Sequence, residues 1–209
     1  MVKRTKEDAS ATRALILEQA TVLFEEKGYA ATTLDEIAAA AGVTKGAIFH
    51  HFKNKKDLFT DIWVTLQLEV DTDIRRTAAK VAAASEDPFL GMIAGAKCQV
   101  DYLKQSRFAR IVMLEGPTVL GMDEWVERDV ALAKNRVDKA IDYLIAKGQL
   151  AAPNRESLNL LFTGMLSYAV IASKDLDDPQ SIVDSFEIIL RGLPNSVRRQ
   201  NRSMQTKIP

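Results

Sequence analysis

Apolar residues recur every three or four positions along most of the chain, which is the spacing of one face of an α-helix. The longest runs of this kind lie at 16–24, 58–70 and 126–144. No segment alternates apolar and polar residues over successive positions, as a half-buried strand would. The pattern therefore predicts an all-α fold.

Capping and breaking residues divide this pattern into separate helices. The expected helices lie at 12–27, 34–41, 45–51, 54–83, 88–104, 123–147, 154–174 and 178–192, with a shorter one after Ser106. The Gly116-Pro117 step should end that shorter helix and leave 114–121 as an ordered loop. Residues 1–11 and those beyond Pro194 show no periodicity, so we expect a mobile arm at one end and a disordered basic tail at the other.

Three helix starts fall close together between residues 33 and 54. Thr33 is followed three residues later by Glu36, which is the spacing of a capping box. Gly42 supplies a backbone that can end the first of these helices, and Thr44 can cap the second. Two short helices joined by a glycine-containing turn predict a helix-turn-helix.

The charge of this segment is one-sided. From residue 43 to residue 56 there are four lysines and two histidines but no carboxylate, although the whole chain carries 28 basic and 28 acidic residues. Lysines in this arrangement suit DNA phosphates, and the helix at 45–51 is small enough on its exposed face to enter the major groove. The alternative is a solvated basic surface on an ordinary helical hairpin.

We assign individual DNA contacts within the segment as predictions. The side chains expected at phosphates are Thr33, Thr44, Lys53 and Lys55. Those expected at base edges are Lys45, Ala47 and His50, with Gly46 and Phe49 on the same exposed face. The expected partner is double-stranded DNA.

Residues 12–59 resemble the DNA-binding region of the tetracycline-repressor (TetR) family of bacterial transcription regulators. The likeness rests on the run GVTKGAIFHHFKNKKDLF, on the upstream EEKGYAATTLDEIA and on glycines 28, 42 and 46. The resemblance implies a three-helix DNA-binding head, joined by a fourth helix to a larger helical body. One departure is Phe49, because many members have a tyrosine there whose hydroxyl reaches a phosphate.

Charge is divided unequally along the chain, with a net charge of +2 over residues 1–56, −7 over 57–187 and +5 over 188–209. A small basic head on an acidic body is expected when only the head approaches phosphate. We therefore expect a DNA-binding domain at 1–53 and a ligand-binding and dimerisation domain at 54–194, with the tail at 195–209.

Other classes of protein find little support in the sequence. Cys98 is the single cysteine, so no internal disulfide is expected. There is no signal-peptide pattern, and the longest mostly apolar segment, 160–172, is too short to span a bilayer, so we expect a cytoplasmic protein without a membrane partner. The adjacent His50 and His51 lack metal-ligand spacing, and no catalytic or phosphate-loop motif occurs. We expect no metal, no cofactor and no enzymatic activity.

The segment at 158–172 is apolar around most of its circumference, so a helix there needs two packing partners. One partner is the core of the body, and the other is expected to be a second copy of the chain, which gives a homodimer. The predicted interface contains Leu161, Gly164, Tyr168, Phe186 and Ile189. A fully buried central helix in a monomer is the alternative.

The resemblance also implies a cavity for a small molecule among helices four to eight. Aromatic and methionine side chains concentrate there, with polar groups interleaved that can orient a ligand. The residues assigned to this cavity are Trp63, Met92, Gln99, Tyr102, Phe108, Met113, Glu115, Trp125, Phe162 and Thr163.

These features together predict a homodimeric transcription regulator. In this interpretation it is a repressor that binds a palindromic operator and is released by an unidentified small-molecule effector, lipophilic or aromatic in character. The rival interpretation is a helical DNA-binding dimer that is controlled by a protein partner or has no ligand.

Overall fold

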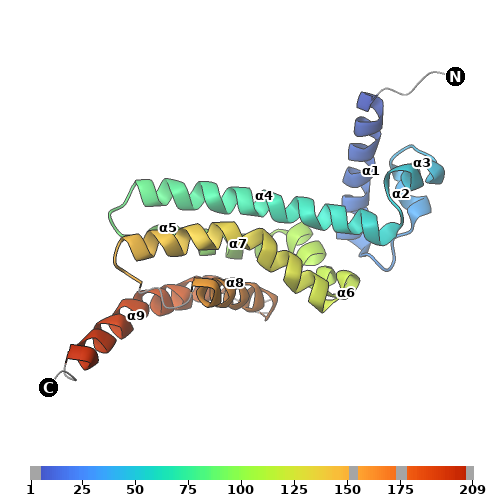
Figure 1. Cartoon of the computed structure of the whole chain (residues 1–209). Coiled ribbons are helices and arrows are strands. Elements are labelled where there is room, and N and C mark those ends of the chain that lie inside the picture. Colours follow the sequence, from blue (N-terminus) through green and yellow to red (C-terminus); the bar gives the residue numbers. More distant parts are fainter. Residues whose placement is uncertain (1–5, 151–154, 173–177, 206–209) are drawn as a thin grey trace. The chain divides into compact units, whose positions relative to one another are not determined.

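The computed structural model describes residues 6–150, 155–172 and 178–205, and these ranges are helical with no strand among them. Figure 1 shows the order of the elements along the chain. They form two compact units. The first unit comprises the residues up to Leu68 together with Gln105–Trp125, and the second comprises Glu69–Lys104 together with the residues from Val126 onward.

The first unit is built on α1 (Lys6–Lys27), α2 (Leu34–Ala40), α3 (Lys45–His51) and the start of α4 (Lys55–Ala83). Helices as short as α2 and α3 are unstable alone, so they depend on a shared core. The buried side chains of this core are Ile16, Ala20, Phe24, Ile37, Ile48, Phe52, Leu58 and Phe59. Burial of each large apolar side chain contributes about 1.5–3 kcal/mol, which fixes α2 and α3 on the longer helices.

The first unit also contains a π-helix, η2 (Phe108–Glu115), which continues directly into α6 (Gly116–Leu120). The expectation of an ordered loop at 114–121 is therefore wrong. Pro117 lies in the first turn of α6, where its missing N–H removes no helical hydrogen bond. The indole N–H groups of Trp63 and Trp125 both donate to the carbonyl of Val112, at 3.3 and 3.2 Å.

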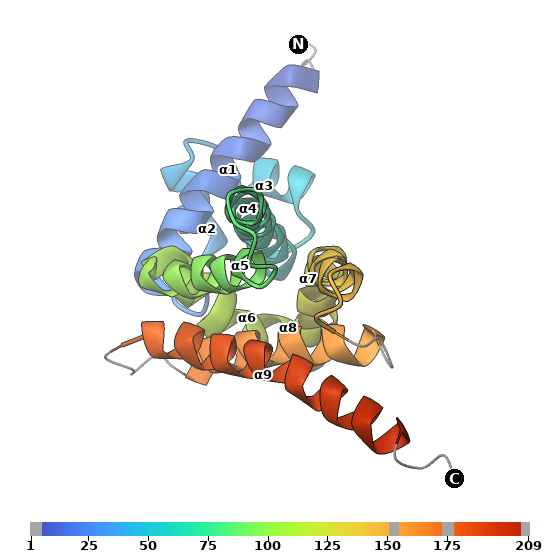
Figure 2. The same cartoon turned by 90° about the vertical axis from the view of Figure 1, so that its left-hand side faces the viewer.

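The second unit contains the rest of α4, α5 (Leu90–Asp101) with a short 3₁₀ turn η1 (Tyr102–Lys104), most of α7 (Met122–Ala146), α8 (Arg155–Ala172) and α9 (Gln180–Gln205). α9 packs against α5, and its Phe186 ring meets that of Phe162 on α8 at a centroid distance of 6.1 Å. Figure 2 views these helices from a direction in which α8 and α9 overlap.

α8 carries a line of polar side chains on the face that meets α7. Asn159 Nδ2 donates to the Lys134 carbonyl at 3.0 Å and to Asp138 Oδ1 at 2.7 Å. One and two turns further on, Thr163 donates to Asn159, and Ser167 donates to Asp129. These buried groups satisfy one another, which fixes the register of α8 on α7.

Two helices extend well beyond the sequence-based expectation. α1 begins at Lys6 rather than near Thr12, because Glu7 and Asp8 favour its first turn and the Thr12 hydroxyl donates to the Asp8 carbonyl inside the helix. α9 continues through Pro194 to Gln205, so residues 195–205 are helical rather than part of a disordered tail. A proline within a helix removes one hydrogen bond and can kink the helix without ending it.

No helix within the described ranges is long and apolar enough to cross a lipid bilayer. Residue 154, where the sequence predicts a helix to begin, and residues 1–5 of the expected N-terminal arm lie outside these ranges.

Candidate nucleic-acid interface

The start of α2 is fixed by the capping box predicted from the sequence. Thr33 has an extended backbone with φ −106° and ψ 156°, and its hydroxyl accepts the Glu36 N–H at 3.2 Å. Glu36 Oε2 in return accepts the Thr33 N–H at 2.8 Å. Both exposed amides at the helix start therefore have partners.

The turn between α2 and α3 depends on Gly42, whose φ is +63°. In this conformation the N–H of Val43 donates to the Ala38 carbonyl at 3.0 Å, which closes the C-terminal end of α2. Thr44 then caps α3 by accepting the Ala47 N–H at 3.1 Å. The expected bounds of α3, 45–51, are confirmed.

α3 has one buried side and one exposed side. Ile48 and the following Phe52 are buried in the core. The predicted DNA contacts on the exposed side are Lys45, Gly46, Phe49 and His50, with Ala47 half-buried and Lys53 exposed just beyond the helix. The Phe49 ring is 50% exposed, which is unusual for a side chain without a polar atom.

Lys45 already has a partner at this surface, because its Nζ lies 2.8 Å from Asp35 Oδ2 on α2. Both side chains are largely exposed, so the pair contributes about 0–1 kcal/mol. Lys45 is therefore held close to the exposed face of α3 but can exchange Asp35 for another acceptor at low cost.

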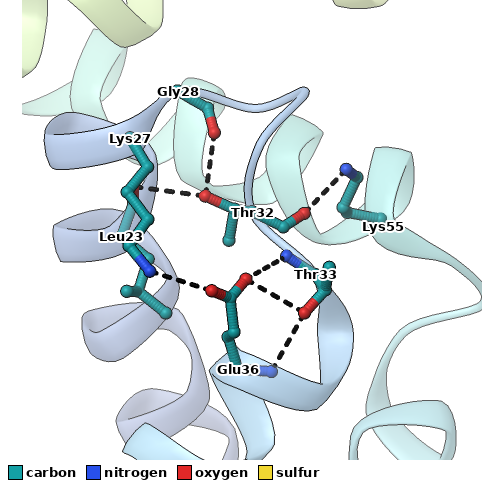
Figure 3. Close-up of polar contacts among 7 residues, drawn as sticks. All are labelled: Leu23, Lys27, Gly28, Thr32, Thr33, Glu36 and Lys55. Atoms are coloured by element: carbon teal, nitrogen blue, oxygen red, sulfur yellow. Dashed lines mark hydrogen bonds and ion pairs between the residues drawn. The ribbon is translucent and has the colours of Figure 1, made fainter.

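The corner between α1 and α2 is closed by polar side chains (Figure 3). The buried Thr32 hydroxyl donates to the Gly28 carbonyl at 2.8 Å. Lys27 Nζ donates to Glu36 Oε1 at 2.8 Å, so Glu36 joins the end of α1 to the start of α2. The Lys27 bond first, and then the two from Thr33, lower the pKa of Glu36 to about 2.

Lys55, which we predicted to bind a phosphate, is engaged within this corner. Its Nζ donates to the carbonyls of Tyr29 and Thr32, both at 2.8 Å, and lies 4.2 Å from the centroid of the Tyr29 ring. These partners are 26 and 23 residues away in sequence, so spacing alone gives no signal for them.

Glu115, which we predicted to line a ligand cavity, also lies at this corner. Its Oε2 accepts the Tyr29 N–H at 2.8 Å. Arg110, one π-helical turn earlier on η2, donates to the carbonyls of Glu25 and Glu26 at the end of α1, at 3.0 and 3.2 Å. Sequence reasoning missed both contacts, which join residues more than 80 positions apart.

The other residues assigned to a ligand cavity are divided between the two units. Trp63, Phe108, Met113 and Trp125 are buried around η2 in the first unit. Met92, Gln99, Tyr102, Phe162 and Thr163 belong to the second unit. There the Tyr102 hydroxyl donates to Asp73 at 2.5 Å, and burial followed by this bond raises the pKa of Tyr102 to about 12.

The residues assigned to a dimer interface gather on α8 and α9. Leu161, Tyr168 and Ile189 are 65%, 73% and 47% exposed, although all three are large and apolar or aromatic. A Cβ at Gly164 would meet no atom within 4 Å. Phe186 differs, because it is buried against Phe162 and contributes only to the floor of a groove of about 290 Å³ between α8 and α9.

Two family models match the chain. The model described as "Bacterial regulatory proteins, tetR family" matches residues 16–62, which contain the helix-turn-helix. The model described as "Tetracyclin repressor-like, C-terminal domain" matches residues 89–193.

Individual proteins match either most of the chain or less than a third of it. The Transposon Tn10 TetC protein of Escherichia coli is 28% identical over 195 residues, which cover 92% of this chain and 95% of that protein. The regulator AcrR of Shigella flexneri is 54% identical, but only over 63 residues, which cover 30% of this chain and 29% of AcrR. A solved TetR-family transcriptional regulator from Pectobacterium atrosepticum superposes with a TM-score of 0.73 at 28% identity, over 91% of this chain and 97% of that one.

Proposed function

Because the chain belongs to the TetR family of bacterial transcription regulators, we propose that it is a homodimeric repressor whose α3 helices read a palindromic operator. The observation that carries the proposal is the exposed side of α3. It is capped by Thr44, bears Lys45, Phe49 and His50, and has no carboxylate of its own. A short helix with such a face fits the major groove, where side chains reach base edges.

The residues at this surface are proposed to act in two ways. Thr33, Thr44 and Lys53 lie beside α3 and are proposed to bind phosphates, which would position the helix without reading sequence. Lys45, Ala47 and His50 lie on α3 itself and are proposed to meet base edges. Lys45 would leave Asp35 to do so.

Paired substitutions test this division on a duplex that the wild-type protein enriches from a random-sequence library. Lys45→Ala should relax the base preference at one position per half-site. It should also reduce the binding free energy for the enriched duplex by about 1–3 kcal/mol. Lys53→Ala should weaken binding to the enriched duplex and to random duplexes alike. It should also lower the slope of log affinity against log salt by about one. Equal effects of the two changes on both duplexes would refute the assignment.

The dimer is proposed to form through α8 and α9. Support comes from the exposed Leu161, Tyr168 and Ile189, because a monomer rarely exposes several large apolar side chains together. A palindromic operator with half-sites one turn of DNA apart requires the two α3 helices of a two-fold dimer at that same separation.

We further propose that a small lipophilic or aromatic molecule, bound in the C-terminal part of the chain, releases the protein from DNA. Buried polar residues such as Thr163 were expected to orient a ligand, yet Thr163 donates to Asn159 within the second unit. A thermal-shift screen of lipophilic and aromatic compounds tests for an effector, since a ligand of the folded state raises the melting temperature. Control by a protein partner, or the absence of any ligand, is the alternative if none of these compounds raises it.

A further inference from the structure

Tyr29 is the residue on which three parts of the first unit converge. Its N–H is bound by Glu115 from η2 and its carbonyl by Lys55 from α4, each at 2.8 Å. Its ring packs on Phe24 of α1 and Phe59 of α4, with centroid distances of 5.6 and 5.2 Å. The segment from Gly28 to Thr33, which we call the Tyr29 corner, is thus held from two sides.

Lys55 holds the side of the corner that leads into α2. Two of its three ammonium hydrogens go to the carbonyls of Tyr29 and Thr32, and the charge lies over the Tyr29 ring. The residue after Thr32 is Thr33, the cap of α2. A shift of Lys55 would therefore move the start of α2.

Glu115 holds the opposite side, where α1 ends. A Cβ on Gly28 would collide with Glu115 Oε1, so the carboxylate fits against a bare backbone. Arg110 binds the last carbonyls of α1 and lies 3.8 Å from Glu115 Oε1. Both side chains come from η2, so this helix is attached to the corner by Glu115 and to the end of α1 by Arg110.

The π-helical form of η2 makes this attachment possible. Arg110 and Glu115 are five residues apart, and in a π-helix residues at that spacing lie one turn apart on the same side. In an α-helix the same spacing turns the second side chain by about 140° away from the first. The π-helical form therefore directs both side chains toward the end of α1.

We propose that Lys55 and Glu115 are positioning residues for DNA reading, which set the start of α2 through the Tyr29 corner rather than by touching DNA. Through Glu115, η2 would act on α2 and α3, although it lies far from them in sequence. The inference rests on the proposed DNA-binding function, and it replaces the phosphate contact predicted for Lys55.

The salt dependence of DNA binding separates a positioning residue from a phosphate ligand. On the enriched duplex, full-length Lys53→Met should lower the slope of log affinity against log salt by about one. Lys55→Met should weaken binding about tenfold, within the range typical of coupled sites, and leave that slope unchanged. Lys56→Met is the matched control, because its ammonium bonds to the Leu120 carbonyl and Glu124 instead of the corner, and it should bind as wild type.

Amide hydrogen exchange tests the corner without DNA. Glu115→Ala should speed exchange at the Tyr29 amide in the folded protein, and Lys55→Met should speed it as well. Because both act through one segment, the DNA affinity of the double variant should fall less than the product of the single losses. Glu115→Gln, which keeps an acceptor oxygen, should restore most of the protection.

Different results would refute the proposed DNA-binding function and the positioning role of Lys55 and Glu115. A wild-type protein that enriches no duplex refutes the proposed function and this inference with it. A wild-type protein that binds DNA, together with a Lys55→Met variant that loses salt slope as Lys53→Met does, refutes the positioning role alone. If Lys55→Met does not fold, the Glu115→Ala variant decides the question. Unchanged amide exchange at Tyr29 and unchanged DNA affinity in that variant would also refute the positioning role.

Discussion

At Gly28 the backbone has a φ of +83°, and a Cβ there would collide with a carboxylate oxygen of Glu115. Two separate effects should therefore lower the free energy of unfolding of Gly28→Ala. The backbone conformation costs about 1–2 kcal/mol for any residue with a Cβ, and displacement of Glu115 adds about 1–3 kcal/mol as an overpacking effect. Urea unfolding monitored by circular dichroism measures the sum.

Gly42 provides the control, because its φ is +63° but no atom lies within 4 Å of the position of a Cβ. Gly42→Ala should lose only the backbone contribution. The difference between the two variants then isolates the contact with Glu115. Equal losses of unfolding free energy would mean that Glu115 moves aside without cost.

The exposed carboxylate of Glu36 should make stability depend on pH. Its pKa in the folded protein is lowered to about 2, chiefly by the bond from Lys27. A carboxylate with a lowered pKa stabilises the fold above its unfolded pKa of about 4.3 and loses this effect as the pH falls toward 2. Glu36→Gln should melt below the wild type at pH 6, and the difference should shrink between pH 5 and pH 2.

Melting temperatures of the two proteins over that range measure this difference. Other carboxylates titrate in both proteins, so only the gap between them reports on Glu36. A gap that stays constant down to pH 2 would contradict the lowered pKa.

Local signals explain which features of the interface could be predicted at this scale. Thr33, Gly42 and Thr44 act on backbone groups within a few residues of themselves, so their types and spacing were sufficient. Lys55 and Glu115 act on the Tyr29 backbone from 26 and 86 residues away. The local sequence around this lysine, which lies in a basic run, and around this glutamate, which lies in an apolar helix, does not indicate such partners.

At the level of elements, the junction of η2 and α6 depends on Gly116. A Cβ at this glycine would lie 2.8 Å from Trp63 Nε1 and 3.0 Å from Trp125 Nε1. Gly116→Ala should force the indoles away from the Val112 carbonyl and destabilise the first unit by about 1–3 kcal/mol. The emission of these two tryptophans, the only ones in the chain, should shift to longer wavelength.

Gly192, inside α9, is the matched control, because a Cβ there meets no atom within 4 Å. Gly192→Ala should be neutral or stabilising by up to about 1 kcal/mol, through helix propensity. A Gly116→Ala variant that unfolds like Gly192→Ala, with unshifted emission, would show that the indoles can move without penalty.

Helix periodicity predicted the elements better than it predicted what their polar residues do. The bounds of α2, α3, α4 and α7 agree with expectation to within one or two residues, because apolar spacing and caps are local. Thr163 on α8 was interpreted as a group facing a ligand, yet it donates to Asn159, which itself bonds to Lys134 and Asp138 on α7. Periodicity identifies a face of a helix but not the element that covers it.

At the scale of the whole molecule, the proposed dimer predicts a charge-sensitive surface on α8. Tyr168 is 73% exposed in the single chain, so an aspartate there should leave the fold unchanged. Buried in a dimer, the same aspartate would be an unpaired charge, and Tyr168→Asp should weaken association at least about tenfold. Sedimentation at micromolar concentration measures the mass.

Tyr143→Asp is the matched control, because this tyrosine is 38% exposed and belongs to α7, which contributes no residue to the proposed interface. It should sediment as the wild type does. A wild type that is monomeric at micromolar concentration would refute the dimer, as would a dimer that Tyr168→Asp does not weaken.

The ion pair of Lys45 with Asp35 has a consequence for how the protein would search a genome. On random DNA, where no base edge offers Lys45 a better acceptor, the pair can persist, and Lys45 releases no counterion. In the proposed function Lys45 would exchange Asp35 for a base at a matching site, which costs about 0–1 kcal/mol and is offset only there. Asp35 would thus reduce the contribution of Lys45 to non-specific DNA binding. Asp35→Asn should therefore lengthen the dwell time on random DNA more than on the operator.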